Sequence, residues 1–292
     1  MSVVLTEIEE VRAAVGFRRA GRVLRRPGLV AGAIMLAGVA GALVVAPQLG
    51  LRDPLATDVP HRLAGFSWDH PLGTDGLGRD MLSRIVHGGR SSVALTMVVT
   101  IIATTLGVVF GVAAGFLGGI VDALVLRVIE VVQAVPLVIV TMVSVGLLGG
   151  GPTKLVLVLA ILGWTGQARV VRAAALSLRE REFVMAARAN GASGLRIAWR
   201  HLVPNLLGPV VVLATLEVGR ILLALSTLSF LGLGTRPPEP EWGSMLAEAR
   251  TYFFVAPRLL IIPGMAIFVV TMATNLFGEG LRDAFEGRTA RA

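Results

Sequence analysis

The sequence has 292 residues, of which 54% are hydrophobic and only 16% charged, and its mean hydropathy is +0.77. Soluble domains carry about 25% charged residues, so this composition excludes an ordinary soluble protein and indicates an integral membrane protein. The net charge of +8 does not predict a nucleic-acid partner, because the basic residues gather between the apolar stretches, and the absence of cysteine excludes a disulfide framework or a thiolate site.

Six stretches of the chain are apolar enough to cross a bilayer, which takes about 20 residues of helix. They cover roughly residues 28–48, 92–116, 128–149, 154–169, 206–230 and 258–278. The predicted fold class is therefore all-α, a polytopic membrane protein with about six transmembrane helices.

The charge distribution predicts the orientation. Lys and Arg gather in residues 1–27 and 170–205, which places both termini in the cytoplasm. The first apolar stretch is longer than the 7–15 residues of a signal peptide, so it is read as an uncleaved anchor. The predicted parts are a cytoplasmic leader, a first transmembrane helix with an extracytoplasmic loop, a transmembrane domain and a cytoplasmic tail, at 1–27, 28–91, 92–279 and 280–292.

The end of the extracytoplasmic loop reads HPLGTDGLGRDMLSRIVHGGRSSV. Asp75 is a plausible N-cap, and apolar residues follow it at helical spacing. The spacing predicts an amphipathic helix on the outer surface with Arg79, Ser83 and Arg84 on its polar face. A solvated linker helix and a structured role at the mouth of a translocation path both remain open.

Glycine and proline mark features of the second, third and fourth stretches. Small residues such as Gly107, Gly111 and Gly115 predict close helix packing in the second stretch. Pro136 predicts a kink in the third. The run Gly149-Gly150-Gly151-Pro152 predicts the turn that separates the third stretch from the fourth.

Glu217 and Arg220 lie inside the fifth stretch at i, i+3 spacing. Charges within a membrane are costly and usually face a bundle interior or a wet cavity. The pair could line a substrate path, or it could be a packing ion pair that neutralises itself. The structural interpretation is preferred, and the path-lining one remains open.

Enzyme motifs are missing from the sequence. GGGPTK is not a phosphate-binding loop, because Thr153 precedes Lys154, the one lysine of the chain, and Leu155 follows it. The four histidines form no zinc-protease pattern, and there is no G-x-S-x-G elbow. The sequence therefore favours a non-catalytic protein over a membrane-embedded enzyme.

Residues 170–205 form the largest predicted cytoplasmic loop. It reads as two short helices, the first over about 179–190, with Gly191 in the left-handed position after it and Ser193 as the next N-cap. Pro204 ends the second helix and starts the fifth span. An apolar stripe on the second helix predicts a docking element rather than a lipid-binding loop, and its members are Leu195, Ala198, Trp199 and Leu202.

The segment MAARANGASGLRIAWRHLVP resembles the EAA loop of ATP-binding-cassette (ABC) importer permeases. Ala186, Ala187, Gly191 and Pro204 fall in register with that loop. Met185 stands where the loop usually has Glu, so no salt bridge is carried over to this position. The ATPase-coupling residues that the resemblance implies, together with the docking residue proposed above, are Met185, Ala186, Ala187, Gly191, Trp199 and Pro204.

Further segments, in the right order, resemble the C-type permease subunit of dipeptide/oligopeptide importers. They are HPLGTDGLGRDMLSRIVHGGRSS, SLREREFVMAARANGAS, LSFLGLG, PPEPEWGSML and NLFGEGLRDAFEGR. The resemblance spans about residues 20–290 and implies the MetI-like fold of type I importers in a bacterial inner membrane. It makes 92–279 the permease domain, 179–204 the coupling loop, and the following residues an outer-loop motif: Gly73, Thr74, Asp75, Gly78, Arg79, Asp80, Ser83 and Arg84.

The resemblance also implies the partners. They are a second permease chain in a heterodimer, two ABC ATPase subunits, an extracytoplasmic substrate-binding protein and membrane lipid. ATP and Mg²⁺ belong to the ATPases, and no cofactor belongs to this chain. The expected cargo is a di- or oligopeptide, with nickel, glutathione or another small solute as alternatives. An ion-coupled secondary transporter is the alternative of a different class, but no inverted repeat supports it.

Overall fold

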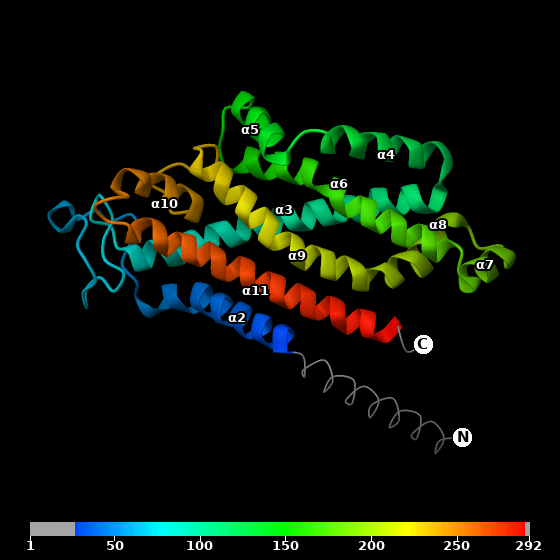
Figure 1. Ribbon diagram of the computed structural model, residues 1–292, viewed down its shortest axis with the longest axis horizontal. Coiled ribbons are helices and arrows are strands. Elements are labelled where there is room, and N and C mark those ends of the chain that lie inside the picture. The colour runs from blue at the N-terminus through cyan, green and yellow to red at the C-terminus, as the bar shows by residue number, and fades with distance from the viewer. Residues whose placement is uncertain (1–26, 290–292) are drawn as a thin grey trace, which may run out of the picture.

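A computed structural model describes residues 27–289, and Figure 1 shows an elongated bundle of helices whose two described ends lie on the same side. Its long and short helices are α2 (Pro27–Val45), α3 (Met81–Leu117), α4 (Gly119–Gln133), α5 (Leu137–Leu147), α6 (Pro152–Arg179), α7 (Glu182–Ala189), α8 (Gly194–Ile197), α9 (Val203–Phe230), α10 (Trp242–Ala249) and α11 (Arg258–Thr289). Short 3₁₀ turns cover Ala46–Leu49, Val59–His61 and Arg250–Tyr252, and a π-helical turn covers Ala198–Leu202. Within 27–289 there is no β-strand.

The predicted spans are confirmed as helices. Five helical segments are long and apolar enough to cross a membrane: Pro27–Gln48, Met81–Leu117, Pro152–Arg179, Gly194–Phe230 and Arg258–Phe285. The pair α4 and α5 makes a sixth if it is counted as one broken span. Several spans are longer than predicted, because polar residues near their ends continue the helix. The predicted leader lies outside the described residues except for Pro27, as do residues 290–292 of the tail.

Glycines of α3 allow a close contact with α6. In α3, a Cβ on Gly107, Gly111 or Gly115 would lie 2.7–2.8 Å from atoms of α6, closer than side-chain carbons approach. The predicted close packing in the second span is therefore confirmed, and its partner is α6. Helices meet this closely through small residues when hydrophobic burial in lipid supplies little driving force.

The third span is broken rather than gently kinked. The axes of α4 and α5 differ by 84°, and Pro136 is the N-cap of α5. Proline lacks the N–H that would continue the helix, so the break falls where the sequence predicts a kink. The next turn has three successive glycines with positive φ, Gly149, Gly150 and Gly151, which confirms the predicted separation of α5 from α6.

The bundle has two ends that differ in construction. The α10 end comprises the loop of residues 50–80, the first turns of α3 and α11, and α10; it lies at the left of Figure 1. The α7 end comprises α7, α8 and the π-helical turn, and the described ends of α2 and α11 lie on its side of the bundle.

Candidate functional site

The predicted motif before α3 is a tight turn, and the helix begins later than expected. Asp75 is not an N-cap of α3, since its Oδ1 accepts hydrogen bonds from the backbone N–H groups of Leu77 (2.8 Å) and Arg79 (3.0 Å). Gly78 has φ +79°, and a Cβ there would clash with the backbone of Asp58. Asp80 is the N-cap instead and accepts from the N–H of Ser83 at 2.8 Å. The predicted amphipathic surface helix is therefore corrected: the helix that leads into the second span begins only at Met81 and is continuous with it to Leu117.

The polar residues of this motif are buried, which corrects the predicted exposed polar face. Arg79 is 3% exposed and Arg84 is 1% exposed. Arg79 Nε donates to Asp75 Oδ2 at 2.6 Å, and Arg84 Nε lies 3.4 Å from the same oxygen. Both guanidinium groups also bond Glu248 of α10, with Arg84 Nη2 3.1 Å from Oε2. These four residues, Asp75, Arg79, Arg84 and Glu248, are called the charged cluster below.

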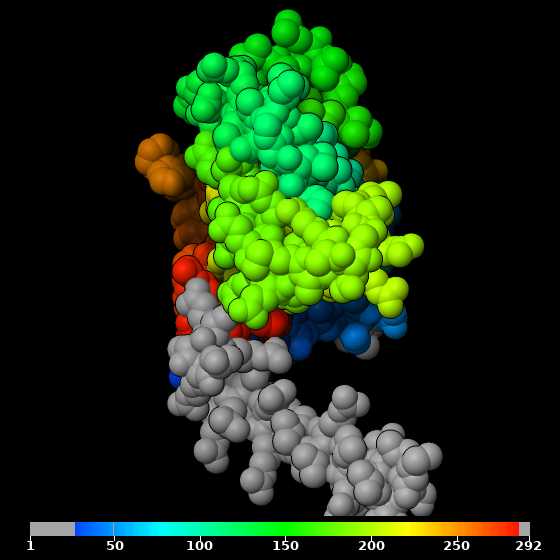
Figure 2. All heavy atoms as spheres, turned by 90° about the vertical axis from the view of Figure 1, so that its right-hand side faces the viewer, coloured from blue at the N-terminus to red at the C-terminus, as the bar shows by residue number. Residues whose placement is uncertain are grey.

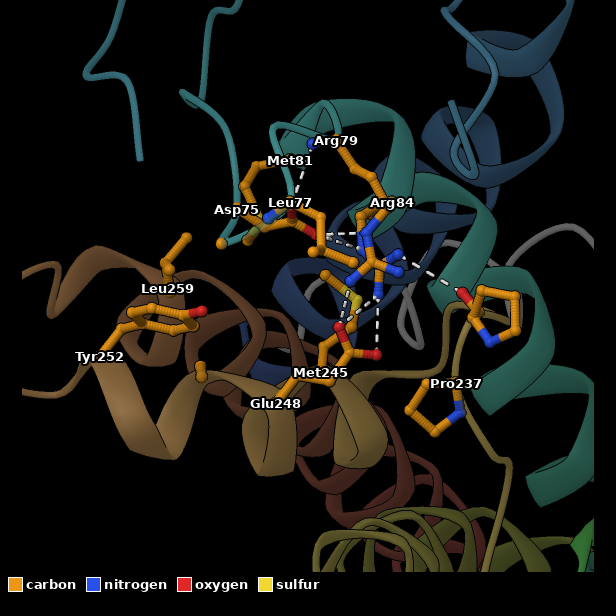
Figure 3. A pocket seen from close by; sticks show the side chains of 13 residues that line it. Asp75, Leu77, Arg79, Met81, Arg84, Pro237, Met245, Glu248, Tyr252 and Leu259 are labelled. Atoms are coloured by element: carbon orange, nitrogen blue, oxygen red, sulfur yellow. Dashed lines mark hydrogen bonds and ion pairs between the residues drawn. The ribbon is translucent and has the colours of Figure 1, made fainter. Parts of the chain in front are cut away.

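The charged cluster forms one wall of a cavity of about 410 Å³ at the α10 end. Figure 3 shows Arg84 between Asp75 and Glu248, with Tyr252 and Leu259 on the other side of the cavity. The cluster carries two positive and two negative charges, so it is neutral as a unit. Buried ionic groups that are this fully paired fix geometry, and breaking one pair is costly.

A second polar group joins the loop to the start of α3. His70 Nδ1 lies 2.9 Å from Asp80 Oδ1, and His70 Nε2 lies 3.1 Å from Arg52 Nη1. Because arginine can only donate, Nε2 accepts and the proton of the neutral ring is on Nδ1, where it is donated to Asp80. Thr74 is fully buried and accepts from the N–H of Ala64 at 2.8 Å. The eight predicted motif residues thus lie together around this turn.

The sequence analysis did not single out two acids of this region, the half-buried Glu248 and the fully buried Glu241. Glu241 is fully buried at the N-terminus of α10 and accepts from the backbone N–H groups of Gly243 (2.9 Å) and Ser244 (3.0 Å). Ser92 of α3 donates to it at 3.0 Å. An acidic residue directly before Trp242-Gly-Ser was the available signal, since carboxylates cap helices. Together these bonds fasten α10 to α3.

Residues 179–204, the predicted coupling loop, form the surface of the α7 end. Gly191 has φ +76° with open space around it, and Ser193 occupies the N-cap position of α8, as predicted, although its side chain makes no capping bond. The predicted first helix is shorter, because α6 runs to Arg179 and α7 begins at Glu182. Pro204 starts α9 as predicted but does not end a separate helix, since the chain is helical from Gly194 through the π turn to Phe230.

The predicted apolar stripe is wrong, because its residues do not share a single face. Leu195 and Trp199 are 72% and 64% exposed, whereas Ile197 and Leu202 are buried. The two buried residues pack with Val184 of α7 against α3 and α6. Ile197 and Leu202 thus hold the loop against the bundle, while Leu195 and Trp199 point away from it. Met185 and Ala186 are also exposed, and Ala187 is half-buried.

A shallow hollow lies between α7 and the π turn. Figure 2 views this end of the molecule and shows the loop, in yellow-green, across the middle of the face. The hollow is lined by basic, amide, aromatic and small side chains: Phe183, Ala187, Asn190, Ala192, Arg196, Arg200 and His201. Such a surface can accept a partner's carboxylates and an apolar side chain.

The intramembrane charges are paired as their spacing predicted. Arg220 Nη1 donates to Glu217 Oε2 at 3.0 Å. The Glu217 side chain is 16% exposed and turns toward the bundle, whereas the Arg220 side chain is 73% exposed. The function of this ion pair stays a prediction.

Among residues 27–289 no group of three metal-ligating side chains is brought together.

Known proteins resemble this chain closely. Residues 107–291 match the family model of the binding-protein-dependent transport system inner membrane component. The chain belongs to this family. It is 42% identical to the nickel transport system permease protein NikC of Escherichia coli (strain K12) over 231 residues, covering 79% of this chain and 83% of NikC.

Two further relatives are named for other substrates. The dipeptide transport system permease protein DppC of Alkalihalophilus pseudofirmus is 35% identical over 279 residues, covering 95% of this chain and 92% of DppC. The glutathione transport system permease protein GsiD of Shigella flexneri is 41% identical over 222 residues, covering 76% and 73%. The chain is therefore a multi-pass permease subunit of an ABC importer in the inner membrane. The predicted family and fold class are confirmed.

Proposed function

We propose that this permease is one half of a heterodimeric translocation pathway for di- and oligopeptides and that it converts ATPase motion into alternating access. The observation that carries the proposal is the coupling loop. Its exposed surface is continuous in sequence with two spans, α6 and α9, and its buried residues Ile197 and Leu202 pack into the bundle. A partner that moves the loop therefore moves both spans.

The α7 end is assigned to the cytoplasm. The described ends of α2 and α11 lie on the same side as the coupling loop, and Lys and Arg gather in the segments of this side. Two ABC ATPase subunits then bind ATP and Mg²⁺ and receive the coupling loop in a surface cleft. Gly191 supports this role because its left-handed turn sets the angle between α7 and α8.

The α10 end then faces the outside, where a substrate-binding protein delivers the cargo. The charged cluster supports this assignment by holding the loop of residues 50–80 and α10 as one unit. A second, related permease completes the pathway. Alternating access arises when ATP biases one end of a bundle with two stable arrangements and the loaded binding protein biases the other.

Peptide is the proposed cargo because the dipeptide permease DppC is similar over 95% of this chain. Nickel is the second candidate, favoured by the 42% identity to NikC, and glutathione is the third, with 41% identity to GsiD.

The proposal is tested by purifying the tagged permease from its native membrane in mild detergent and identifying the proteins that accompany it. We expect a second permease and P-loop ATPases, and uptake of dipeptide into liposomes that depends on ATP and on the binding protein. A chain that purifies alone and transports without ATP would be an ion-coupled secondary transporter. ATP-dependent uptake of nickel or glutathione but not of dipeptide would replace the proposed cargo.

A further inference from the structure

Arg220 is a charged residue well inside the apolar helical segment Gly194–Phe230, which is long enough to cross a membrane. It lies in α9 about 15 Å before the end of the helix at Phe230, by the rise of 1.5 Å per residue. Lys and Arg near a helix end reach the headgroups with their long side chains. Arg220 lies too far from the helix end at Phe230 for its side chain to do the same. The guanidinium therefore needs a polar environment at its own depth.

The structure supplies only part of that environment. Glu217 takes one N–H of Arg220, through Nη1 at 3.0 Å, and the Arg220 side chain remains 73% exposed. The Glu217 side chain turns toward the bundle. It therefore contacts the guanidinium group on one side and leaves the rest of that group exposed. Neighbouring Gly219 fits against Thr271 and Thr274 of α11, which fixes the rotation of α9 and directs Arg220 away from that helix.

The same face of α9 continues toward the α10 end with Leu223 and Thr227, both exposed. Neither carries a charge, and the Glu217 carboxylate turns inward, so the exposed charge on this face of the helix is that of Arg220. Arginine presents several N–H donors in a plane and binds carboxylates through two of them at once. A bare divalent cation is repelled by the same group.

We propose that Arg220, positioned by Glu217, is a mid-membrane contact for the carboxylate of a passing solute. This inference rests on the proposed function, because it requires that this face of α9 lines the pathway. It assigns the pathway to solutes that carry a carboxylate, such as peptides or metal chelates with carboxylate ligands, and not to a free metal ion. It gives the pair a role in transport, where the sequence preferred a structural one.

The test exploits the absence of cysteine from the chain. Leu223→Cys places one thiol about one helical turn from Arg220, and Phe254→Cys places a control thiol on an exposed residue of the α10 end. The complex with its partner subunits is placed in nanodiscs, so that reagents reach both faces. Each variant is treated with an anionic (sulfonatoethyl) and a cationic (trimethylammonioethyl) methanethiosulfonate, and modification of this chain is followed by intact mass.

We expect the Leu223→Cys thiol to react, with an anionic-to-cationic rate ratio at least about fivefold above that of Phe254→Cys, as expected for a unit charge a few ångströms away. Arg220→Gln should abolish this preference and Arg220→Lys should keep it. If Arg220→Gln does not assemble, the double variant Glu217→Gln/Arg220→Gln removes both charges and should abolish the preference too. An added dipeptide with a free carboxylate should slow modification more than its C-terminal amide.

Two results would overturn the inference. A Leu223→Cys thiol that does not react in a complex that hydrolyses ATP would show that this face is packed against protein or lipid. A thiol that reacts with a ratio insensitive to Arg220→Gln would show that Arg220 does not select charge. Both leave the permease assignment intact, because that assignment fails separately, when no ATPase accompanies the chain.

Discussion

The α10 end and the α7 end use arginine in opposite ways. At the α10 end, Arg79 and Arg84 are buried and fully engaged with Asp75 and Glu248. At the α7 end, Arg196 and Arg200 line an open hollow beside the exposed Trp199. The first arrangement joins distant segments of one chain into a fixed unit. The second leaves the guanidinium donors and apolar area exposed, and under the proposed function this exposed surface is where the ATPase docks.

The largest effect is expected from breaking the charged cluster. Arg84→Leu leaves Asp75 and Glu248 short of a partner in a buried site, which costs about 3–5 kcal/mol. The measurement is thermal unfolding of the purified complex, with the yield of folded protein as a second readout. Arg127→Leu is the matched control, because the Arg127–Glu130 pair is exposed and exposed pairs contribute little. Equal melting temperatures for the two variants would contradict the structural role of the cluster.

Trp199→Ala tests the opposite property at the α7 end. The side chain is 64% exposed, so its loss should leave thermal stability of the isolated chain unchanged. Binding of the ATPases should weaken by about 2 kcal/mol, roughly thirtyfold in Kd, as for a tryptophan anchor at an interface. Trp68→Ala is the control, since Trp68 is fully exposed at the α10 end. ATPase retention that is the same in both variants would argue against docking through Trp199.

Gly191→Val changes the geometry of the coupling loop without crowding it. The site has φ +76° and open space, so the change strains the backbone by about 1–2 kcal/mol. We expect uptake to fall about tenfold while ATP hydrolysis continues. Gly232→Val has the same strain and open space after α9, at the α10 end. Unaltered uptake in Gly191→Val, or an equal loss in Gly232→Val, would remove the special role of this turn.

The smallest effect concerns the attachment of α10 to α3. Ser92→Ala removes the donor to buried Glu241 and the acceptor for the N–H of Trp242, which costs about 1 kcal/mol. A small decrease in melting temperature should follow. Thr105→Ala is the control, because that hydroxyl is exposed and bonds only its own helix. No difference between the two would mean that the Ser92 hydroxyl adds nothing to the attachment of α10, which the charged cluster and apolar contacts would then provide.

The sequence predicts those features that depend on short spacing. Apolar length gave the spans, proline gave the break at Pro136, and glycine gave the left-handed turn at Gly191. The Glu217–Arg220 pair followed from its i, i+3 spacing. Each of these is decided within a few residues of chain, so no knowledge of tertiary contacts was needed.

The missed features depend on distant partners or on an irregular turn. Arg84 pairs with Glu248, 164 residues away, and periodicity alone cannot distinguish an exposed arginine from a buried, paired one. The coupling-loop stripe failed because the π turn at Ala198–Leu202 adds a residue per turn and rotates later side chains off the expected face. Leu195 and Trp199 remain on one exposed face, whereas Leu202, at the end of the π turn, is rotated into the bundle.

The most direct test of the central claim replaces Trp199 with a photo-crosslinking phenylalanine analogue in the native membrane. The account predicts that light links this chain to a P-loop ATPase, identified by mass spectrometry, and that the link forms in the assembled transporter. The same analogue at Trp68 should not capture an ATPase. Crosslinks from position 199 to lipid alone, in a transporter that still hydrolyses ATP and takes up solute, would contradict the assignment of the α7 end as the coupling surface.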